Sequence, residues 1–478
     1  MPIVRGAVQG STEVPRATVT GELFFLSLGN DRFLVYAPLQ LAALIVNRGM
    51  IGVLQRFLEN PSPGDGPADP AIALFRSLGI LDPGPEDLPI RAVSGPPEPT
   101  QVTLLLTTAC NFRCSYCYAA APDAEPAYMS LETAARAIRF VIANAVRRSA
   151  PLIDVSFHGG GEPTLHWPVL TASADYARRL AAESGRSLAL TLATNGYLAE
   201  GQIDWVLANL TSASVSFDGL PEIHDANRPS AAGCGTSQRV MRTLRGFDEA
   251  GFSYGIRATV LANQIPRLQE SVEFIFANFR PRVVQIEPVY RLGRGRSEAS
   301  AESDAFIAQY RRARARWPSL MFSGAKLDVL ANHFCAATAD GFCVSAAGNI
   351  TACTEAFSET SRFADRFFYG RPAVGCDGYD FDPKALEFLR SSGVENRAFC
   401  RGCFARWTCA GDCLHKVLDV NDGAELAGAG RCRVIRELTK DLLLERIEQT
   451  GGGTWRRLRP SAAPVAGCVP CAGGDSDA

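Results

Sequence analysis

The feature that most constrains the fold is a series of six strand-like runs through the middle of the chain. These runs are residues 102–107, 153–159, 188–195, 213–219, 254–260 and 283–288. Most are separated by stretches with helical periodicity, such as LETAARAIRFVIANAVRR. Strands that alternate with helices form right-handed βαβ units around a parallel sheet. Because six units are too few to close an eight-stranded barrel, we predict an α/β fold with an open, partial (β/α)6 TIM-like barrel.

Length and composition set the number of domains and the broad class of the protein. At 478 residues the chain exceeds one ordinary core, so two or three domains are expected. The longest apolar run is interrupted by polar residues, which predicts no membrane partner. A net charge of −2 lacks the basic excess of a nucleic-acid-binding surface. Fifteen cysteines without an apolar signal core favour a cytoplasmic protein that binds metal or clusters rather than forming disulfides.

Shifts in composition divide the chain into four predicted parts. They are an N-terminal module at 1–95, the barrel at 96–325, a cysteine-rich region at 326–448 and a disordered Gly-, Ala- and Pro-rich tail at 449–478. In the module, FFLSLG and RFLVYAP predict paired strands, whereas LQLAALIV, IGVLQRFL and AIALFRSLGIL predict helices. A strand pair followed by helices suits a small winged-helix-like module, and a plain packing extension of the barrel is the alternative.

Three cysteines with the spacing C-x3-C-x2-C follow the first strand: Cys110, Cys114 and Cys117. Three thiolates can hold three irons of a four-iron cluster and leave the fourth iron open to a small molecule. Structural zinc takes four ligands, and no fourth Cys or His lies nearby in the sequence, so we favour the cluster. The carboxyl ends of barrel strands, where this triplet stands, supply the catalytic groups of such folds.

The next two strands also end in residues suited to ligand binding. Gly160, Gly161 and Glu162 follow the second strand within HGGGEP. The glycines let the backbone approach a ligand, and the carboxylate can receive an ammonium group. The third strand ends in Thr194 and Asn195, a polar turn placed to hydrogen-bond a ribose.

The last three strands add further polar side chains at the same predicted mouth. The fourth strand ends in Ser216 and Asp218, and Arg228 follows in the segment HDANRP. Asp218 is interpreted either as a turn former or as a ligand contact. Arg257 in the fifth strand and Glu287 in the sixth reach the mouth if they face inward, and either can instead belong to a buried pair.

Eight more cysteines form a second constellation. They are Cys335, Cys343, Cys353, Cys400, Cys403, Cys409, Cys413 and Cys432. Two of them stand on either side of Gly348 as C-x4-G-x4-C, and four follow as C-x2-C-x5-C-x3-C. A zinc ribbon explains the second group alone and leaves the first three cysteines idle. The tail pair Cys468 and Cys471 is either a redox dithiol or a chance C-x2-C.

Together these motifs resemble the radical S-adenosylmethionine (radical SAM) enzymes that carry a SPASM domain. The likeness rests on the triplet, with Tyr116 before its last cysteine, on the GGEP turn and on the S-x-D-G…H-D-x-x-R segment. It implies an oxidoreductase with three [4Fe-4S] clusters, one of which binds S-adenosyl-L-methionine through an open iron. The cofactor contacts that it implies are Tyr116, Gly160, Gly161, Glu162, Thr194, Asn195, Ser216 and Arg228.

The same resemblance implies the ligands of two auxiliary clusters. The first would use Cys335, Cys343, Cys353 and Cys413, and the second would use Cys400, Cys403, Cys409 and Cys432. Four cysteines at each cluster leave no open iron, which favours electron transfer or a structural role over substrate binding.

One departure from the family pattern bears on the substrate. Relatives that mature sulfatases carry Asp directly after the cysteine equivalent to Cys353, whereas this chain has Thr354 and then Glu355. This departure, and an N-terminal module that resembles leader-peptide recognition domains, favour a maturase that cross-links side chains of a ribosomally made (RiPP) peptide through C–C or thioether bonds. Its expected partners are the precursor peptide and an electron donor such as flavodoxin or ferredoxin. The alternatives are maturation of a folded protein such as a sulfatase, peptide epimerisation and a non-catalytic iron–sulfur electron carrier.

Overall fold

The computed structural model describes residues 18–59, 69–121, 125–290, 293–295, 302–423, 426, 428 and 430–457. At its centre lies a sheet of eleven strands. They are β4 (Gln101–Leu105), β5 (Leu152–His158), β6 (Ser187–Thr194), β7 (Ser212–Ser216), β8 (Tyr254–Val260), β9 (Val283–Pro288), β10 (Leu320–Met321), β11 (Cys343–Val344), β12 (Ile350–Thr351), β13 (Phe368–Pro372) and β14 (Tyr379–Phe381). Their order is β10-β9-β8-β7-β6-β5-β4-β11-β12-β13-β14. Strands β4 to β9 are parallel and coincide with the six predicted runs, which confirms a mostly parallel α/β sheet of partial-barrel type.

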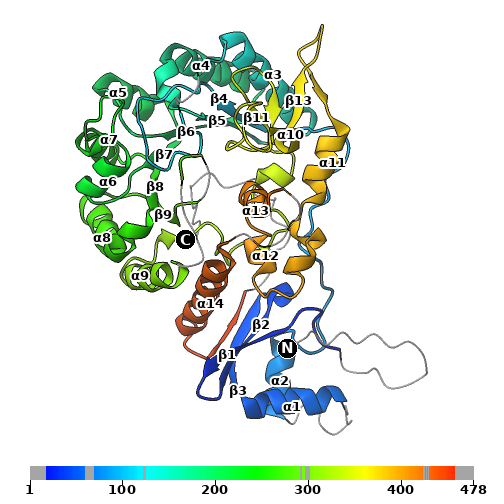
Figure 1. Cartoon of the computed structure of the whole chain (residues 1–478). Coiled ribbons are helices and arrows are strands. Elements are labelled where there is room, and N and C mark those ends of the chain that lie inside the picture. Colours follow the sequence, from blue (N-terminus) through cyan, green and yellow to red (C-terminus); the bar gives the residue numbers. More distant parts are fainter. Residues whose placement is uncertain are drawn as a thin grey trace.

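Seven helices cover the outer face of the parallel strands (Figure 1). They are α3 (Leu131–Arg147), α4 (Trp167–Glu183), α5 (Glu200–Asn209), α6 (Pro221–Asn227), α7 (Ser237–Glu249), α8 (Leu268–Asn278) and α9 (Ser303–Arg316). The Ser130 hydroxyl caps α3 by accepting from the amide of residue 133 at 3.0 Å. Ile138 and Val141 then face the sheet, where Val155 and Phe157 alternate outward from β5, and all four side chains are fully buried.

The cysteine-rich region continues the same sheet beyond β4. Strand β11 pairs with β4 in parallel, and β12, β13 and β14 follow as antiparallel neighbours. Its helices are α10 (Ala364–Phe367), α11 (Pro383–Ser391), α12 (Arg406–Cys409) and α13 (Leu414–Val420). Short 3-10 helices occur at Pro38–Gln40, Pro163–His166, Ala262–Arg267, Ala336–Thr338, Val394–Asn396 and Ala398–Cys400. This continuity places the C-terminal cysteines beside the strand that precedes the triplet.

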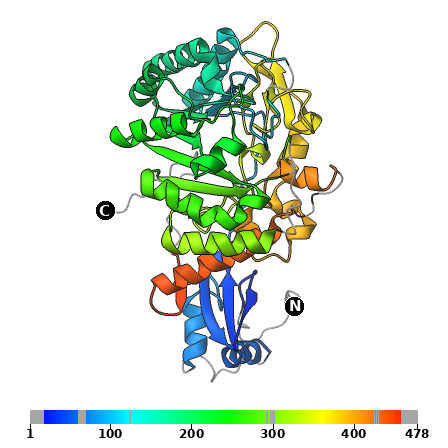
Figure 2. The same cartoon turned by 60° about the vertical axis from the view of Figure 1, so that its left-hand side comes forward.

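The N-terminal module is a second, four-stranded sheet with two helices below the barrel (Figures 1 and 2). Its elements are β1 (Phe24–Gly29), β2 (Arg32–Ala37), β3 (Ala42–Asn47), α1 (Arg48–Glu59), α2 (Pro70–Ser77) and the C-terminal β15 (Thr454–Arg456). The antiparallel order is β1-β2-β3-β15. The tail predicted from residue 449 therefore contributes a strand before residue 458, and its remainder, with Cys468 and Cys471, lies outside the described residues.

One predicted helix of this module is wrong. Residues 39–46 were expected to be helical, but a 3-10 turn through the left-handed Leu41 leads into β3, which pairs with β2 along its length. The run AALIVN is apolar throughout, so its periodicity cannot distinguish a buried strand from a buried helix. Burial on both faces decides: Val35 and Leu44 face α1 and α2, whereas Tyr36 and Ala43 join the main core.

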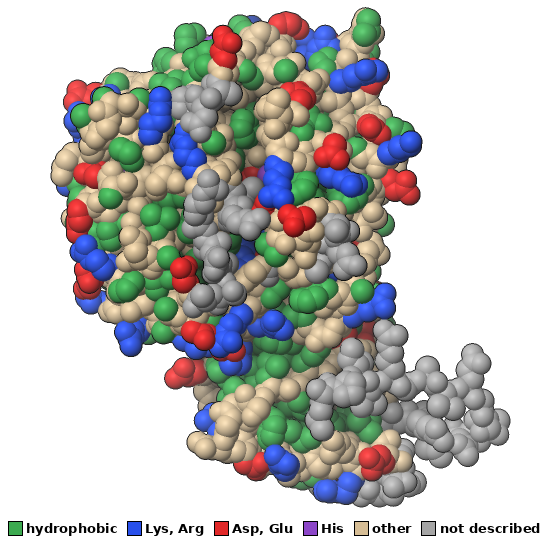
Figure 3. All heavy atoms as spheres, in the orientation of Figure 1, with side chains coloured by type: hydrophobic (Ala, Val, Ile, Leu, Met, Phe, Trp, Pro, Cys, Tyr) green, Lys and Arg blue, Asp and Glu red, His purple; other side chains and the backbone are tan. Residues whose placement is uncertain are grey.

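The helix α14 (Cys432–Gln449) joins the module to the rest of the molecule. It contacts β3 and β15 on one side and α9 on the other. Figure 2 shows it between the barrel and the small sheet, and Figure 3 shows hydrophobic side chains gathered at this neck. Although α14 has 18 residues, none of the described helices is both long and apolar enough to cross a membrane.

Candidate active site

The three cysteines of the triplet lie in the loop that follows β4, at the carboxyl end of the sheet. The amides of Arg113 and Ser115 tie this loop to carbonyl groups at and just after the end of α6, at 2.8 and 2.9 Å. Burial, with repulsion from neighbouring thiolates, raises the pKa of Cys110 to about 12 and that of Cys114 to about 11. Such thiols ionise when they bind a metal, so Cys110, Cys114 and Cys117 fit a cluster with three protein ligands.

The glycine turn after β5 packs directly on the triplet loop. A Cβ atom on Gly161 would lie 1.9 Å from the Ala109 carbonyl oxygen, and one on Gly160 would lie 2.3 Å from the Phe357 ring. The Glu162 amide donates to the Ala109 carbonyl at 2.7 Å. We predicted that these glycines approach a ligand. In the structure they lie close to other parts of the chain and fix the turn against the cysteine loop, and their approach to a ligand stays a prediction.

Glu162 is a buried brace between β5 and β6. Its carboxylate accepts hydrogen bonds from the Thr164 amide and hydroxyl, the Thr194 hydroxyl and the Asn195 amide, at 2.7 to 3.2 Å. The Asn195 side chain donates to Asn111 in the triplet loop at 2.8 Å. Burial raises the pKa of Glu162, and these donors oppose the rise. Glu162, Thr194 and Asn195 therefore bind one another and lock two strand ends to the cysteine loop. Their contacts with an ammonium group and a ribose stay predictions.

A second buried network lies behind Cys114. The Arg228 guanidinium forms a two-point ion pair with Asp218, at 3.0 and 3.1 Å, and its carbon lies 5.1 Å from the centre of the Tyr116 ring. The Tyr116 hydroxyl donates to the same carboxylate. Burial raises the pKa of Asp218, but Arg228 outweighs it and holds that pKa below its ordinary value. Asp218 is thus the partner of a buried cation, and Arg228 is held by Asp218.

The cation that faces the mouth of the barrel is Arg257. It stands opposite Ser216 in the register of β7 and β8, and its side chain is exposed although it lies mid-strand. Its charge reaches Tyr118 and His158, and with burial as the larger cause it lowers the pKa of His158 to about 4. No ion pair of Arg257 occurs among the residues that the structure describes. Glu287, which was considered together with Arg257, forms an ion pair with the buried Arg431.

The cysteines of the C-terminal region lie in two groups. Neighbouring thiols are Cys335, Cys353 and Cys413 in one group, and Cys400, Cys403, Cys409 and Cys432 in the other. Cys343 lies in β11, on the hairpin that leads to Cys353. Burial raises the pKa of Cys413 and of Cys432 to about 11. No disulfide joins any of the thirteen cysteines within the described ranges, so both groups have the donor chemistry that an iron–sulfur cluster needs.

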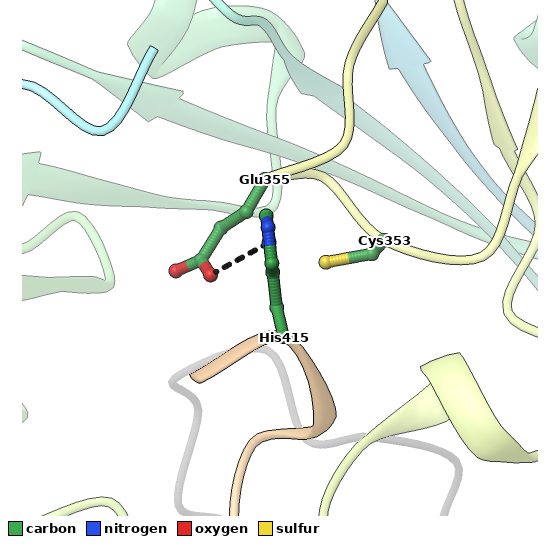
Figure 4. Close-up of side chains that lie close together, drawn as sticks. All are labelled: Cys353, Glu355 and His415. Atoms are coloured by element: carbon green, nitrogen blue, oxygen red, sulfur yellow. Dashed lines mark ion pairs between the residues drawn. The ribbon is translucent and has the colours of Figure 1, made fainter. Parts of the chain in front are cut away.

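A cavity of about 910 Å³ opens between the triplet loop and the cysteine-rich region. Tyr118 and Phe357 form an aromatic wall with ring centres 6.3 Å apart, and Glu355 and His415 also line the cavity. Figure 4 shows these two side chains meeting beside Cys353, with 3.4 Å between the carboxylate Oε2 and the imidazole Nδ1. Sequence reasoning missed His415. Its position two residues after Cys413 in the motif C-x3-C was the available signal.

Residues 104–275 of the chain match the Radical SAM superfamily. This chain carries a radical SAM domain. The matched stretch begins in β4 and ends in α8, so it contains the cysteine triplet, the glycine turn and both buried networks.

Curated relatives of this radical SAM domain cover part of the chain. It is 26% identical over 210 residues to the Fe-coproporphyrin III synthase of Methanosarcina barkeri, covering 44% of this chain and 48% of that protein. It is 28% identical over 249 residues to the pre-heme d1 synthase of Dinoroseobacter shibae, covering 50% and 55%. The matches thus span about half the length of these relatives.

Solved structures share the fold over a larger part of the chain. The structure of anSMEcpe with bound AdoMet superposes with a TM-score of 0.58 and 17% identity, covering 74% of this chain and 96% of that one. The same protein with bound AdoMet and the Kp18Cys peptide gives a TM-score of 0.57 and 17% identity, with 73% and 99% covered.

Proposed function

We propose that this chain is a radical SAM enzyme that matures a peptide. The observation that carries the proposal is the convergence of three half-buried thiols at the carboxyl end of β4, beside two strand ends that are locked to the same loop. Cys110, Cys114 and Cys117 would hold a [4Fe-4S] cluster with one open iron for S-adenosyl-L-methionine. With both bound, one-electron reduction supplies a 5′-deoxyadenosyl radical that removes a hydrogen atom from a substrate carbon.

The chain's own residues bind and orient the cofactor in this proposal. Arg257 and Ser216 face the mouth from neighbouring strands, and a guanidinium with no ion pair among the described residues suits the cofactor carboxylate. Arg228, another cofactor contact that the resemblance implies, has its guanidinium paired with Asp218. Glu162 keeps the glycine turn in place, so the backbone of the turn, rather than the carboxylate alone, faces the ligand.

We assign two auxiliary clusters to the C-terminal cysteines. The first set is Cys335, Cys343, Cys353 and Cys413, and the second is Cys400, Cys403, Cys409 and Cys432. Full cysteine ligation suits electron transfer, and an oxidised product requires an exit for one electron from the substrate. An external donor such as flavodoxin or ferredoxin would supply the electron that starts each turnover.

A precursor peptide is the substrate that we favour. The cavity between the triplet loop and the cysteine-rich region has room for several side chains. The anSMEcpe structure with AdoMet and a peptide, which has the same fold, supports a peptide as the class of substrate. The proposed product is an oxidative cross-link, either C–C or thioether. The N-terminal module would bind the leader of the precursor, and the β1 edge of its sheet is unpaired among the described strands.

Maturation of a folded protein such as a sulfatase is the second candidate. The anSMEcpe fold favours it, as does a carboxylate of this chain, Glu355, beside the cavity. The mass of the product distinguishes these candidate reactions. A cross-link removes two hydrogens from a co-expressed precursor peptide, epimerisation leaves the mass unchanged, and a sulfatase substrate gains a formylglycine.

The radical step has a direct test. Anaerobically reconstituted protein with dithionite and S-adenosyl-L-methionine is expected to release 5′-deoxyadenosine, and Cys114→Ala is expected to abolish release while keeping the auxiliary iron. Cys376→Ala, which removes an exposed thiol outside all three sets, serves as the control and should match the unsubstituted protein. Absence of 5′-deoxyadenosine under every reducing condition would rule out the proposed radical SAM activity.

A further inference from the structure

Arg431 is a fully buried cation whose donors are all used. Its Nε and Nη2 donate to both oxygens of Asp412 at 2.6 to 2.9 Å. Nη1 donates to Glu287 and to the Tyr290 hydroxyl, each at 2.6 Å, and Nη2 also donates to the Ser323 hydroxyl at 3.0 Å. A guanidinium has five N–H groups, and this arrangement satisfies every one. Side chains from three separate segments therefore meet on a single residue.

On one side, Arg431 holds the loop that joins the two auxiliary cysteine sets. Asp412 lies between Cys409, assigned to the second set, and Cys413, assigned to the first. Its carboxylate also accepts the Cys413 amide at 2.7 Å. Residues 410–412 all have positive φ, at 52°, 80° and 66°, a conformation that non-glycine residues rarely adopt. The loop thus needs outside contacts to keep its shape.

A second buried arginine, Arg397, also holds this loop. Arg397 donates to the Gly411 carbonyl through Nη1, and to the Ser392 carbonyl through Nε and Nη2 at 3.1 and 2.9 Å. Both arginines are 2% exposed. Two guanidinium groups thus fix a three-residue connection between ligands of different sets.

On its other side, Arg431 binds the carboxyl end of the barrel. Glu287 is in β9, and its carboxylate also accepts from the Ser323 amide at 2.9 Å and the Tyr290 hydroxyl at 2.8 Å. Arg431 directly precedes Cys432, which is assigned to the second auxiliary set. One side chain therefore links the last strand of the barrel to both cysteine groups.

We propose that Arg431 is a positioning residue that acts through Asp412 to set the placement of both auxiliary clusters relative to each other and to the barrel. The inference rests on the proposed assignment of the two cysteine sets. A buried ion pair adds little net stability because desolvation offsets its attraction, so its value lies in fixing one arrangement. Coupled placement matters because electron transfer between clusters falls steeply with distance.

The experiment uses the full-length chain with Cys110, Cys114 and Cys117 replaced by Ala, so that the auxiliary clusters alone contribute. Arg431→Met and Asp412→Asn are introduced singly and together, and Arg431→Lys and Glu287→Gln provide milder variants in case Arg431→Met does not fold. Arg311→Met is the matched control, because Arg311 joins α9 to α14 at the surface through Glu437 and Asp441. The readouts are the EPR spectra and midpoint potentials of the reduced clusters and the iron content per chain.

We expect Arg431→Met to shift the signals of both auxiliary clusters, because the Asp412 loop carries one ligand of each. The double variant should shift them no further than the larger single variant, since Arg431 acts through Asp412. Arg431→Lys and Glu287→Gln should give smaller shifts in the same direction, and Arg311→Met none. Unchanged spectra in every Arg431 and Asp412 variant, or a change in one cluster alone, would overturn the inference. A triple-Ala protein that holds no iron would overturn the auxiliary clusters as well.

Discussion

At the scale of single residues, the site depends on buried carboxylates whose partners lie on other strands. Glu162 accepts four hydrogen bonds from the ends of β5 and β6. Glu162→Gln replaces one acceptor oxygen with a donor that faces donors, so we expect the free energy of unfolding to fall by about 2–3 kcal/mol. Urea unfolding of the metal-free protein measures the change. The exposed Glu200→Gln, as control, should stay within about 0.5 kcal/mol, and equal effects would contradict the brace.

Asp154 makes stability depend on pH. Burial inside the barrel raises its pKa to about 6, above the ordinary 3.8. Because the folded pKa is the higher one, the contribution of Asp154 to stability is fully present below about pH 4 and is lost as the pH rises through 6. Asp154→Asn should therefore stabilise the protein by up to about 3 kcal/mol at pH 8 and by almost nothing at pH 4. Unfolding at both pH values checks this, and a gain independent of pH would contradict the buried charge.

The residue roles were the least predictable part of the site. The motif placed Glu162 and Asp218 just after strand ends, but the sequence does not distinguish a carboxylate that binds a ligand from one that braces a turn. What separates them is the set of partners, and the amide of Asn195 or the hydroxyl of Tyr116 comes from elsewhere in the chain. The sequence contains no local signal of those contacts.

At the scale of elements, the glycine turn shows why a motif is spaced as it is. Gly161→Ala would place a methyl group 1.9 Å from the Ala109 carbonyl, so the turn and the triplet loop must separate. We expect a loss of at least 2 kcal/mol, on the order of an overpacked core, and weaker iron binding by the triplet. Gly201→Ala is the control, because that glycine lies in α5 with open space around it and should be neutral or slightly stabilising. Iron content and thermal unfolding of both variants decide the point.

The elements themselves were largely predictable. The six parallel strands β4 to β9 follow from apolar runs bounded by turns, because most of these runs are separated by stretches with a clear helical period. The exception is β3, whose apolar run is compatible with either a helix or a strand. It pairs with β15 from the other end of the chain, and the local sequence carries no signal of that pairing. Long-range pairing thus sets the limit of prediction here.

At the scale of the whole molecule, charged side chains close to cysteines connect the N-terminal module, the barrel and the cysteine-rich region. Glu22 of the N-terminal module binds Arg406 and the Trp407 indole N–H, each at 2.8 Å, between Cys403 and Cys409. Glu22→Ala leaves both donors buried without this partner and should lower the free energy of unfolding by about 2–4 kcal/mol.

The matched control for this tie is a surface pair of the same module. Asp31→Ala removes the exposed pair with Arg48 and should change stability by less than 1 kcal/mol. Chemical unfolding of the two variants compares them directly. An equal loss in the free energy of unfolding for Asp31→Ala and Glu22→Ala would contradict a special role for the contact of Glu22 with Arg406 and Trp407.

We propose that one continuous fold holds three separate sets of cysteine ligands, one of which has three cysteines instead of four. Iron content per chain after anaerobic reconstitution tests this most directly. We expect about twelve irons for the unsubstituted protein and about eight when Cys110, Cys114 and Cys117 are all replaced by Ala. A value near four in the unsubstituted protein, or no loss of iron in the triple variant, would contradict it.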